Sequence, residues 1–93
     1  MPDVFEELYD TILSRKAHPR PDSYTARLLE RGEDEILKKV GEESVEVILA
    51  AKSQGNERLV SEAADLLYHL LVLFASRGLT FDDVRAELSR RRR

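Results

Sequence analysis

The chain has 93 residues, of which 42% are hydrophobic and 35% are charged, with a net charge of −3 at pH 7 and no cysteine. This length fits one small domain, residues 1–93, and excludes a second domain with its own cofactor fold. The composition is that of a folded rather than a disordered chain. The lack of cysteine excludes disulfides, thiolate metal sites and a cysteine nucleophile.

The sequence predicts no membrane segment. Its longest apolar run covers residues 70–75, whereas a membrane span needs about 20 apolar residues. The first residues also lack the basic and then apolar layout of a signal peptide. We therefore expect a cytoplasmic location.

Charge is unevenly distributed along the chain. Residues 90–93 are all arginine, and without their four positive charges the net charge falls from −3 to −7. An acidic body disfavours nucleic acid as a partner. We interpret the arginine tail as a solvated helix end, where basic side chains suit the negative end of the helix dipole; an RNA- or membrane-binding patch is the alternative.

The spacing of apolar residues predicts helices throughout. They are expected from residue 4 to the proline-containing segment 18–22, from 24 to about 31, from about 34 to 53, from about 57 to 77, and from 81 to about 90. Gly32, Gly55 and Gly78 mark helix ends, and Thr80 is placed to cap the last helix. Because no segment alternates with period two, the predicted fold class is all-α, with four or five helices.

The two long helices differ in where their apolar residues lie. With successive residues about 100° apart, the helix 34–53 has one core face, made of Ile36, Leu37, Val40, Val47, Ile48 and Ala51. The helix 57–77 is apolar on nearly every side, apart from a narrow polar stripe of Glu62, Asp65, His69 and Ser76. The short connection predicts that the two helices pack antiparallel. A helix that is apolar all round is surrounded by protein, so we expect dimerisation to complete this bundle core.

Carboxylates occur at matching positions on these two helices. Glu43 and Glu46, with Glu42 beside them, precede the turn, and Glu62 and Asp65 follow it with the same spacing of three. Both pairs lie at a similar depth from the turn, so antiparallel packing brings four or five carboxylates together. Like charges this close repel strongly unless they take up protons or bind a cation.

The ligand chemistry of this cluster favours a hard cation. Oxygen ligands without histidine or cysteine suit Mg²⁺, with Mn²⁺ as a substitute, and substrate phosphates commonly complete a Mg²⁺ site. The pattern predicts a magnesium site and a phosphorylated substrate. The alternative is a solvated glutamate-rich helix face, but carboxylates on an apolar helix favour the metal site because desolvated acids need partners.

Lysines and aromatic residues lie near this cluster. Lys38 and Lys39 either hold phosphate oxygens or only pair with the glutamates one turn later, and Lys39 is favoured because it shares the carboxylate stripe. His69 orients the carboxylate four residues before it, contacts the ligand, or is a buried histidine with satisfied hydrogen bonds. Tyr24 and Thr25 are either recognition residues or packing residues.

Several motifs resemble a known enzyme family. They are S-Y-T-A-R-L-L at 23–29, K-K-V-G-E-E at 38–43, E-E-x-x-E at 42–46, E-x-x-D at 62–65 and D-L-L-Y-H-L-L at 65–71. The paired acidic motifs resemble the all-α MazG-like nucleotide pyrophosphatase superfamily. The other stretches more narrowly resemble its phosphoribosyl-ATP pyrophosphatase family, from about residue 5 to 88.

This resemblance implies hydrolysis of phosphoribosyl-ATP to phosphoribosyl-AMP and pyrophosphate, the second step of histidine biosynthesis. It also implies Mg²⁺ dependence and a homodimer or higher homo-oligomer. The positions that match the metal ligands of the superfamily are Glu43, Glu46, Glu62 and Asp65, with Glu42 as an adjoining carboxylate.

The expected mechanism is metal-assisted attack of water on the bond between the α- and β-phosphates. Glu42 or Glu46 would accept the proton. Lys39, together with Lys38, would neutralise the pyrophosphate. Tyr24, Thr25 and His69 are the other candidate substrate-binding residues.

Three alternatives stand beside this interpretation. The first is a house-cleaning pyrophosphatase of the same superfamily that acts on free (deoxy)nucleoside triphosphates. The second is a non-enzymatic helical module that dimerises or binds a protein through its acidic stripe. The third is RNA binding through the arginine tail, 90–93, which predicts salt-sensitive affinity.

Overall fold

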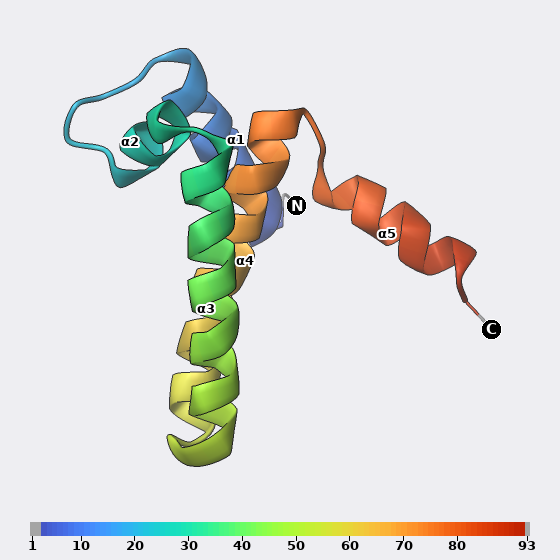
Figure 1. The fold of residues 1–93 in the computed structure, drawn as a ribbon. Helices are drawn as coiled ribbons and strands as arrows, with labels where there is room; N and C mark the ends of the chain where they lie inside the picture. The colour runs from blue at the N-terminus through green and yellow to red at the C-terminus, as the bar shows by residue number, and fades with distance from the viewer. Residues whose placement is uncertain (1–2, 93) are drawn as a thin grey trace.

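The computed structural model describes residues 3–92, and all regular structure in this range is helical (Figure 1). The five helices are α1 (Val4–Ala17), α2 (Tyr24–Arg31), α3 (Glu33–Ser53), α4 (Asn56–Arg77) and α5 (Phe81–Arg90). The all-α prediction is confirmed, and the predicted starts of α3 and α4 differ from the observed ones by a single residue.

Local capping explains where several helices begin and end. Ser23 caps α2 by accepting a hydrogen bond from the backbone N–H of Ala26 at 3.1 Å. Thr80 and Asp83 form a reciprocal capping box at the start of α5. Gly78 ends α4 in the left-handed conformation, with a φ of 71°, which costs a residue without a Cβ little.

Helices α3 and α4 form the long antiparallel hairpin that the sequence predicts (Figure 1). Only Gln54 and Gly55 separate them, and Gly55 makes the turn with a φ of 89°. Helices α1 and α2 pack at the end of the hairpin away from this turn, while α5 projects from the body. The antiparallel hairpin thus places the carboxylates of α3 beside those of α4.

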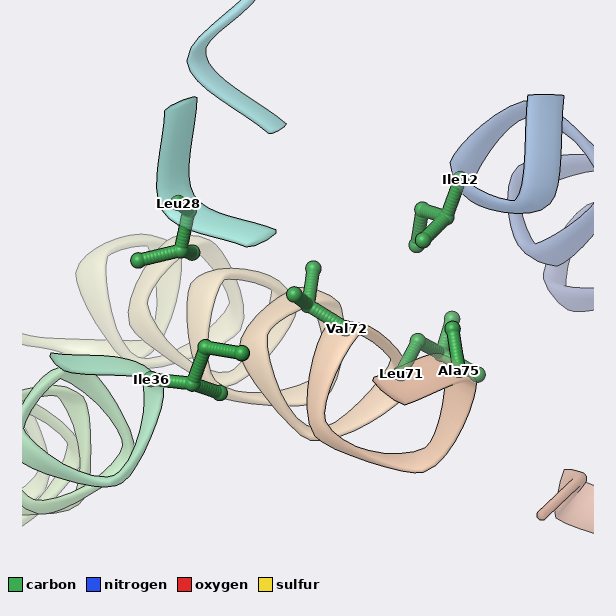
Figure 2. Close-up of a cluster of buried hydrophobic side chains, with 6 residues drawn as sticks. All are labelled: Ile12, Leu28, Ile36, Leu71, Val72 and Ala75. Carbon is green, nitrogen blue, oxygen red and sulfur yellow. The ribbon is translucent and has the colours of Figure 1, made fainter. Parts of the chain in front are cut away.

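The buried core lies where α1, α2, α3 and α4 meet (Figure 2). Its members are Ile12, Leu28, Ile36, Leu71, Val72 and Ala75. Aromatic side chains of α1 and α5 pack against it. Four helices therefore share one apolar cluster, which positions α2 beside the hairpin.

The predicted core face of α3 is only partly correct for the single chain. Ile36 is fully buried, but Leu37, Ile48 and Ala51 are exposed, and Ala50 is buried in their place. On α4, Val60 is 69% exposed although this helix was expected to be surrounded by protein. For Ile48, Ala51 and Val60 the reason is that no third helix within residues 3–92 packs against the part of the hairpin near its turn (Figure 1).

Some residues of the predicted polar stripe of α4 are buried and others are exposed. Glu62 and His69 are buried, each with 6% of its surface exposed, whereas Asp65 is exposed. Burial of polar groups is tolerated when they are hydrogen-bonded or paired. Both residues meet this condition through contacts described below.

Helix α4 is long and apolar enough, by length and composition, to cross a membrane, although the apolar run in the sequence predicts no membrane segment. Core helices of soluble proteins share this property. Here Leu71, Val72 and Ala75 of α4 belong to the shared core, so its hydropathy has a packing explanation.

An ion pair joins the start of α3 to the end of α4. Arg77 donates to both carboxylate oxygens of Glu33, through Nε at 2.5 Å and Nη2 at 3.0 Å. This hydrogen bonding holds the pKa of Glu33 below its ordinary value. The pair therefore contributes to stability above the ordinary glutamate pKa and loses that contribution as the pH falls through the lowered value.

The described part of the arginine tail ends α5 with local ion pairs. Arg90 and Arg91 both pair with Glu87 one turn earlier. These pairs agree with the interpretation of the tail as a solvated helix end. Arg93 lies outside the described residues.

Replacing Val72 with alanine tests the core. The change removes two buried carbon atoms and leaves a cavity, so we expect the free energy of unfolding to fall by roughly 1.5–3 kcal/mol. Val4→Ala is the matched control, because Val4 is 67% exposed and its loss should cost less than about 0.5 kcal/mol. Urea unfolding at one protein concentration measures both, and equal effects would contradict this assignment of the core.

Candidate metal centre

Three carboxylates from two helices converge in the middle of the hairpin. Glu43 comes from α3, and Glu62 and Asp65 come from adjacent turns of α4. One carboxylate oxygen of each lies within 4.8 Å of the others. The structure thus brings together three of the four predicted metal ligands in one compact group.

The remaining acidic candidates line the same cleft. It has a volume of about 590 Å³ and is lined by Lys39, Glu42, Glu43, Val45, Glu46, Glu62 and Asp65. Glu46 is half-buried at this cleft but does not belong to the compact group of three. Glu42 is exposed at the rim. We refer to this feature as the acidic cleft.

Glu62 is the most buried member of the acidic cleft and has a basic partner. Nη2 of Arg58, one helical turn earlier, lies 2.5 Å from Oε1 of Glu62. Arg58 is half exposed, with 55% of its side chain accessible. The sequence analysis did not single out Arg58, although an arginine four residues before a glutamate on a helix is a recognised pairing signal.

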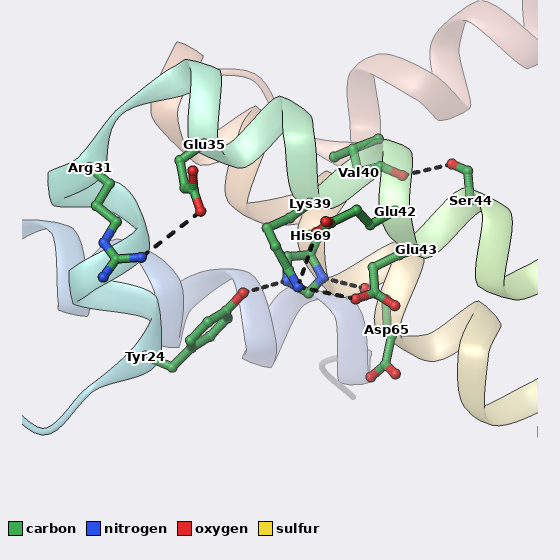
Figure 3. Close-up of polar contacts among 10 residues, drawn as sticks. All are labelled: Tyr24, Arg31, Glu35, Lys39, Val40, Glu42, Glu43, Ser44, Asp65 and His69. Atoms are coloured by element: carbon green, nitrogen blue, oxygen red, sulfur yellow. Dashed lines mark hydrogen bonds and ion pairs between the residues drawn. The ribbon is translucent and has the colours of Figure 1, made fainter.

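Lys39 reaches into the acidic cleft (Figure 3). Its Nζ lies 3.5 Å from an oxygen of Glu42 and 3.6 Å from an oxygen of Glu43. Burial opposes the charged form, but the pKa of Lys39 is raised overall because Tyr24, Glu42 and Glu43 favour the ammonium. Lys38 is exposed and is not among the residues lining the cleft.

His69 is held between α2 and its own helix (Figure 3). Its Nδ1 lies 2.8 Å from the backbone oxygen of Asp65, and its Nε2 lies 2.9 Å from the hydroxyl of Tyr24. A carbonyl oxygen can only accept, so Nδ1 carries the proton, and in the neutral ring Nε2 accepts from Tyr24. His69 therefore contacts the backbone of Asp65, not its carboxylate, and has the bonds of a satisfied buried histidine.

The start of α2 is anchored to α4 by a second polar contact. The hydroxyl groups of Thr25 and Tyr68 are hydrogen-bonded to each other. Tyr24 next to them remains 43% exposed, and its ring packs near those of Tyr68 and His69. Partial burial raises the pKa of Tyr24, so its hydroxyl stays protonated and can donate to His69.

The compact carboxylate group fits a divalent cation. Around an octahedral Mg²⁺ with bonds of about 2.1 Å, neighbouring ligands stand about 3.0 Å apart and opposite ligands about 4.2 Å apart. The three oxygens already lie within 4.8 Å of one another, and all of them are hard ligands. The donor set therefore suits Mg²⁺ or Mn²⁺, and Glu43, Glu62 and Asp65 are the residues that would hold it.

The hydrogen bonds of His69 make a specific prediction for NMR. In ¹⁵N-resolved spectra of the neutral ring, His69 should carry its proton on Nδ1, and exposed His18 is the internal reference. Tyr24→Phe removes the donor to Nε2 and should lower the free energy of unfolding by about 1 kcal/mol. A His69 protonated on Nε2 in the wild-type protein would contradict the arrangement.

Comparison with known proteins identifies the family. A sequence model of the phosphoribosyl-ATP pyrophosphohydrolase family matches residues 5–92. A phosphoribosyl-ATP pyrophosphatase from Lactiplantibacillus plantarum is 57% identical over 86 residues, which cover 92% of this chain and 81% of the relative. Those from Pelotomaculum thermopropionicum and Metallosphaera sedula are 56% and 53% identical, and the matches cover 97% and 98% of this chain and 92% and 98% of the relatives. With its helical hairpin and its carboxylates in one cleft, the chain belongs to the phosphoribosyl-ATP pyrophosphohydrolase family.

Proposed function

We propose that the chain hydrolyses phosphoribosyl-ATP to phosphoribosyl-AMP and pyrophosphate in the acidic cleft, in a reaction that depends on Mg²⁺. The activity follows from membership in the family, whose relatives at 53–57% identity are named for it. The placement of the reaction rests on one observation: carboxylates of Glu43, Glu62 and Asp65 within 4.8 Å of one another. A non-enzymatic helical module gives no reason for this convergence.

Some residues of the acidic cleft would hold the metal ion, and others would act on the water and the phosphates. Glu43, Glu62 and Asp65 would hold the ion, and Glu46, which lines the same cleft, lies outside this group. Bound Mg²⁺ supplies charge neutralisation for the phosphate oxygens and lowers the pKa of water in its coordination shell. The protein would fix the position of the phosphates relative to the carboxylates through the side chains that line the cleft.

A carboxylate outside the compact group is needed to accept a proton from the attacking water. Glu42 is exposed at the rim of the cleft, and one of its oxygens is occupied by the ion pair with Nζ of Lys39 at 3.5 Å. Glu46 is half-buried, lines the cleft and lies outside the group of three. We therefore assign proton abstraction to Glu46 ahead of Glu42.

Lys39 is placed to bind the pyrophosphate that leaves. It lines the acidic cleft and its ammonium remains charged near neutral pH. Once phosphates enter, Lys39 can exchange its contacts with Glu42 and Glu43 for phosphate oxygens. Lys38, one residue before Lys39 on α3, is exposed and would add positive charge at a longer distance from the phosphates.

A homodimer is the assembly that the exposed apolar surface supports. In the half of the hairpin near its turn, four apolar side chains are between 46% and 69% exposed: Val45, Ile48 and Leu49 of α3 and Val60 of α4. Only 28% of the apolar window of α4 is buried within the chain. Exposed apolar surface of this kind marks an interaction site. A second copy against the turn end of the hairpin would cover it, in a cytoplasmic enzyme with a soluble nucleotide substrate.

Substitutions in the cleft separate metal ligands from the proton acceptor. Glu62→Gln and Asp65→Asn should lose both Mn²⁺ binding, measured by calorimetry, and pyrophosphate release from phosphoribosyl-ATP. Glu46→Gln should keep Mn²⁺ binding but lower kcat by about a hundredfold or more, since general base catalysis contributes roughly 10²–10⁴-fold. EDTA should abolish the wild-type activity.

Glu57→Gln is the matched control, because Glu57 is exposed in the first turn of α4 and does not line the cleft. It should leave turnover unchanged. Wild-type kcat in Glu62→Gln with saturating Mg²⁺ would overturn the site assignment. Hydrolysis of deoxynucleoside triphosphates in preference to phosphoribosyl-ATP would instead favour the house-cleaning alternative.

Ile48→Asp tests the proposed dimer. Ile48 is 65% exposed in the single chain, and a charge there would be buried without a partner in an interface. Sedimentation should show a dimer for the wild type and a monomer for the variant. Val4→Asp, at an equally exposed position on α1, should remain dimeric, and a wild type that sediments as a monomer would refute the assembly.

A further inference from the structure

A second hollow adjoins the acidic cleft on the side of α2. It has a volume of about 180 Å³ and is lined by Tyr24, Arg27, Leu28, Arg31, Glu35 and Lys39. We call it the basic hollow. Lys39 lines both the hollow and the cleft, so the two are neighbours along α3.

The two spaces have opposite charge. The basic hollow contains three cations, Arg27, Arg31 and Lys39, against the single carboxylate of Glu35. The acidic cleft contains five carboxylates against Lys39. An anionic group is therefore repelled by the bare cleft and attracted to the hollow beside it.

The guanidinium groups in the hollow are weakly engaged. Arg31 lies 3.9 Å from Glu35, beyond hydrogen-bond distance, and its side chain is 67% exposed (Figure 3). Arg27 donates one long hydrogen bond of 3.3 Å to the backbone oxygen of Pro21. Each guanidinium has five N–H donors, so most donors in the hollow are available to a ligand.

The anchoring of α2 keeps these arginines in place. Tyr24 is bonded to His69, and Thr25 is bonded to Tyr68, so the first turn of α2 is fixed to α4. Arg27 and Arg31 follow on the same helix, one turn apart. A rigid helix with two arginines at this spacing is suited to phosphate, which arginine binds through paired hydrogen bonds.

We propose that the basic hollow binds the phosphate monoester of the phosphoribosyl group, with Arg27 and Arg31 as its ligands. This inference rests on the proposed reaction in the acidic cleft. The substrate carries phosphate at two ends: the triphosphate that reacts, and the 5′-phosphate of the second ribose. The triphosphate needs the cation held by the cleft, whereas the monoester needs cationic side chains of the protein itself.

The separation of the two spaces agrees with the shape of such a substrate. Glu35 in the hollow and Glu43 in the cleft are eight residues apart on α3, or roughly 12 Å along the helix axis at about 1.5 Å per residue. The two phosphorylated ends are separated by two riboses and the adenine base, so both spaces can be occupied by one molecule. Free ATP has no group for the hollow, which makes Arg27 and Arg31 specificity-determining residues.

The test compares two substrates that differ only in this phosphate: phosphoribosyl-ATP and the 5′-dephosphorylated ribosyl-ATP. Arg27→Gln and Arg31→Gln should each raise KM for phosphoribosyl-ATP about tenfold or more, as expected for loss of a charged hydrogen bond. Their kcat should change little. On ribosyl-ATP the variants and the wild type should have the same kcat/KM.

Arg20→Gln is the matched control, because Arg20 precedes α2, pairs with Asp22 and does not line the hollow. It should behave as wild type on both substrates. Arg31→Lys should recover part of the lost affinity because it keeps the charge. Thermal melts of all variants verify folding, and the substrate comparison within each variant is independent of its stability.

The outcomes separate this inference from the proposed function. Unchanged KM for phosphoribosyl-ATP, or equal losses on both substrates, would overturn the role of the basic hollow while the cleft assignment stands. Wild-type turnover in Glu62→Gln would overturn the cleft assignment itself. A phosphate-dependent loss in both arginine variants, with inactive Glu62→Gln, would support the two together.

Discussion

Antiparallel packing of α3 against α4 brings several carboxylates together in one partly buried cleft. The electrostatic repulsion between these carboxylates is the constraint on which the rest of the site depends. At 4.8 Å, two carboxylates repel by roughly 3 kcal/mol at an effective dielectric constant of about 20. Arg58 and Lys39 offset part of this repulsion by pairing with Glu62 and Glu43. A divalent cation would offset far more, which is the physical basis of the proposed metal site.

The same packing explains why α2 matters for function although it is short. Its first turn is tied to α4 by Tyr24 and Thr25, and Leu28 places its middle in the core. This fixes a row of arginines beside the acidic cleft, with Lys39 between positive and negative regions. Charge is thereby separated over a short distance, with carboxylates in the acidic cleft and arginines in the basic hollow.

The distribution of the core reflects the small size of the chain. Buried apolar residues concentrate where α1 and α2 cover the hairpin, and the turn end has no such cover (Figure 1). A short chain buries a limited fraction of its surface on its own. Apolar residues such as Ile48 and Val60 therefore stay exposed at the turn end of the single chain.

The sequence by itself determined the helices and the group of acids, because both depend on local periodicity. Apolar spacing, Ser23, Thr80 and Gly78 fix helix type and ends through contacts within a few residues. Glu43 faces Glu62 and Asp65 because the short turn between α3 and α4 makes these helices pack antiparallel. Other features required the tertiary structure. The burial of Ile36 but not Leu37, the bond from Tyr24 to His69, and the meeting of Arg27 and Arg31 with Lys39 each depend on how α2 docks against the hairpin. That docking is set by packing between residues distant in sequence, which periodicity along one helix does not encode.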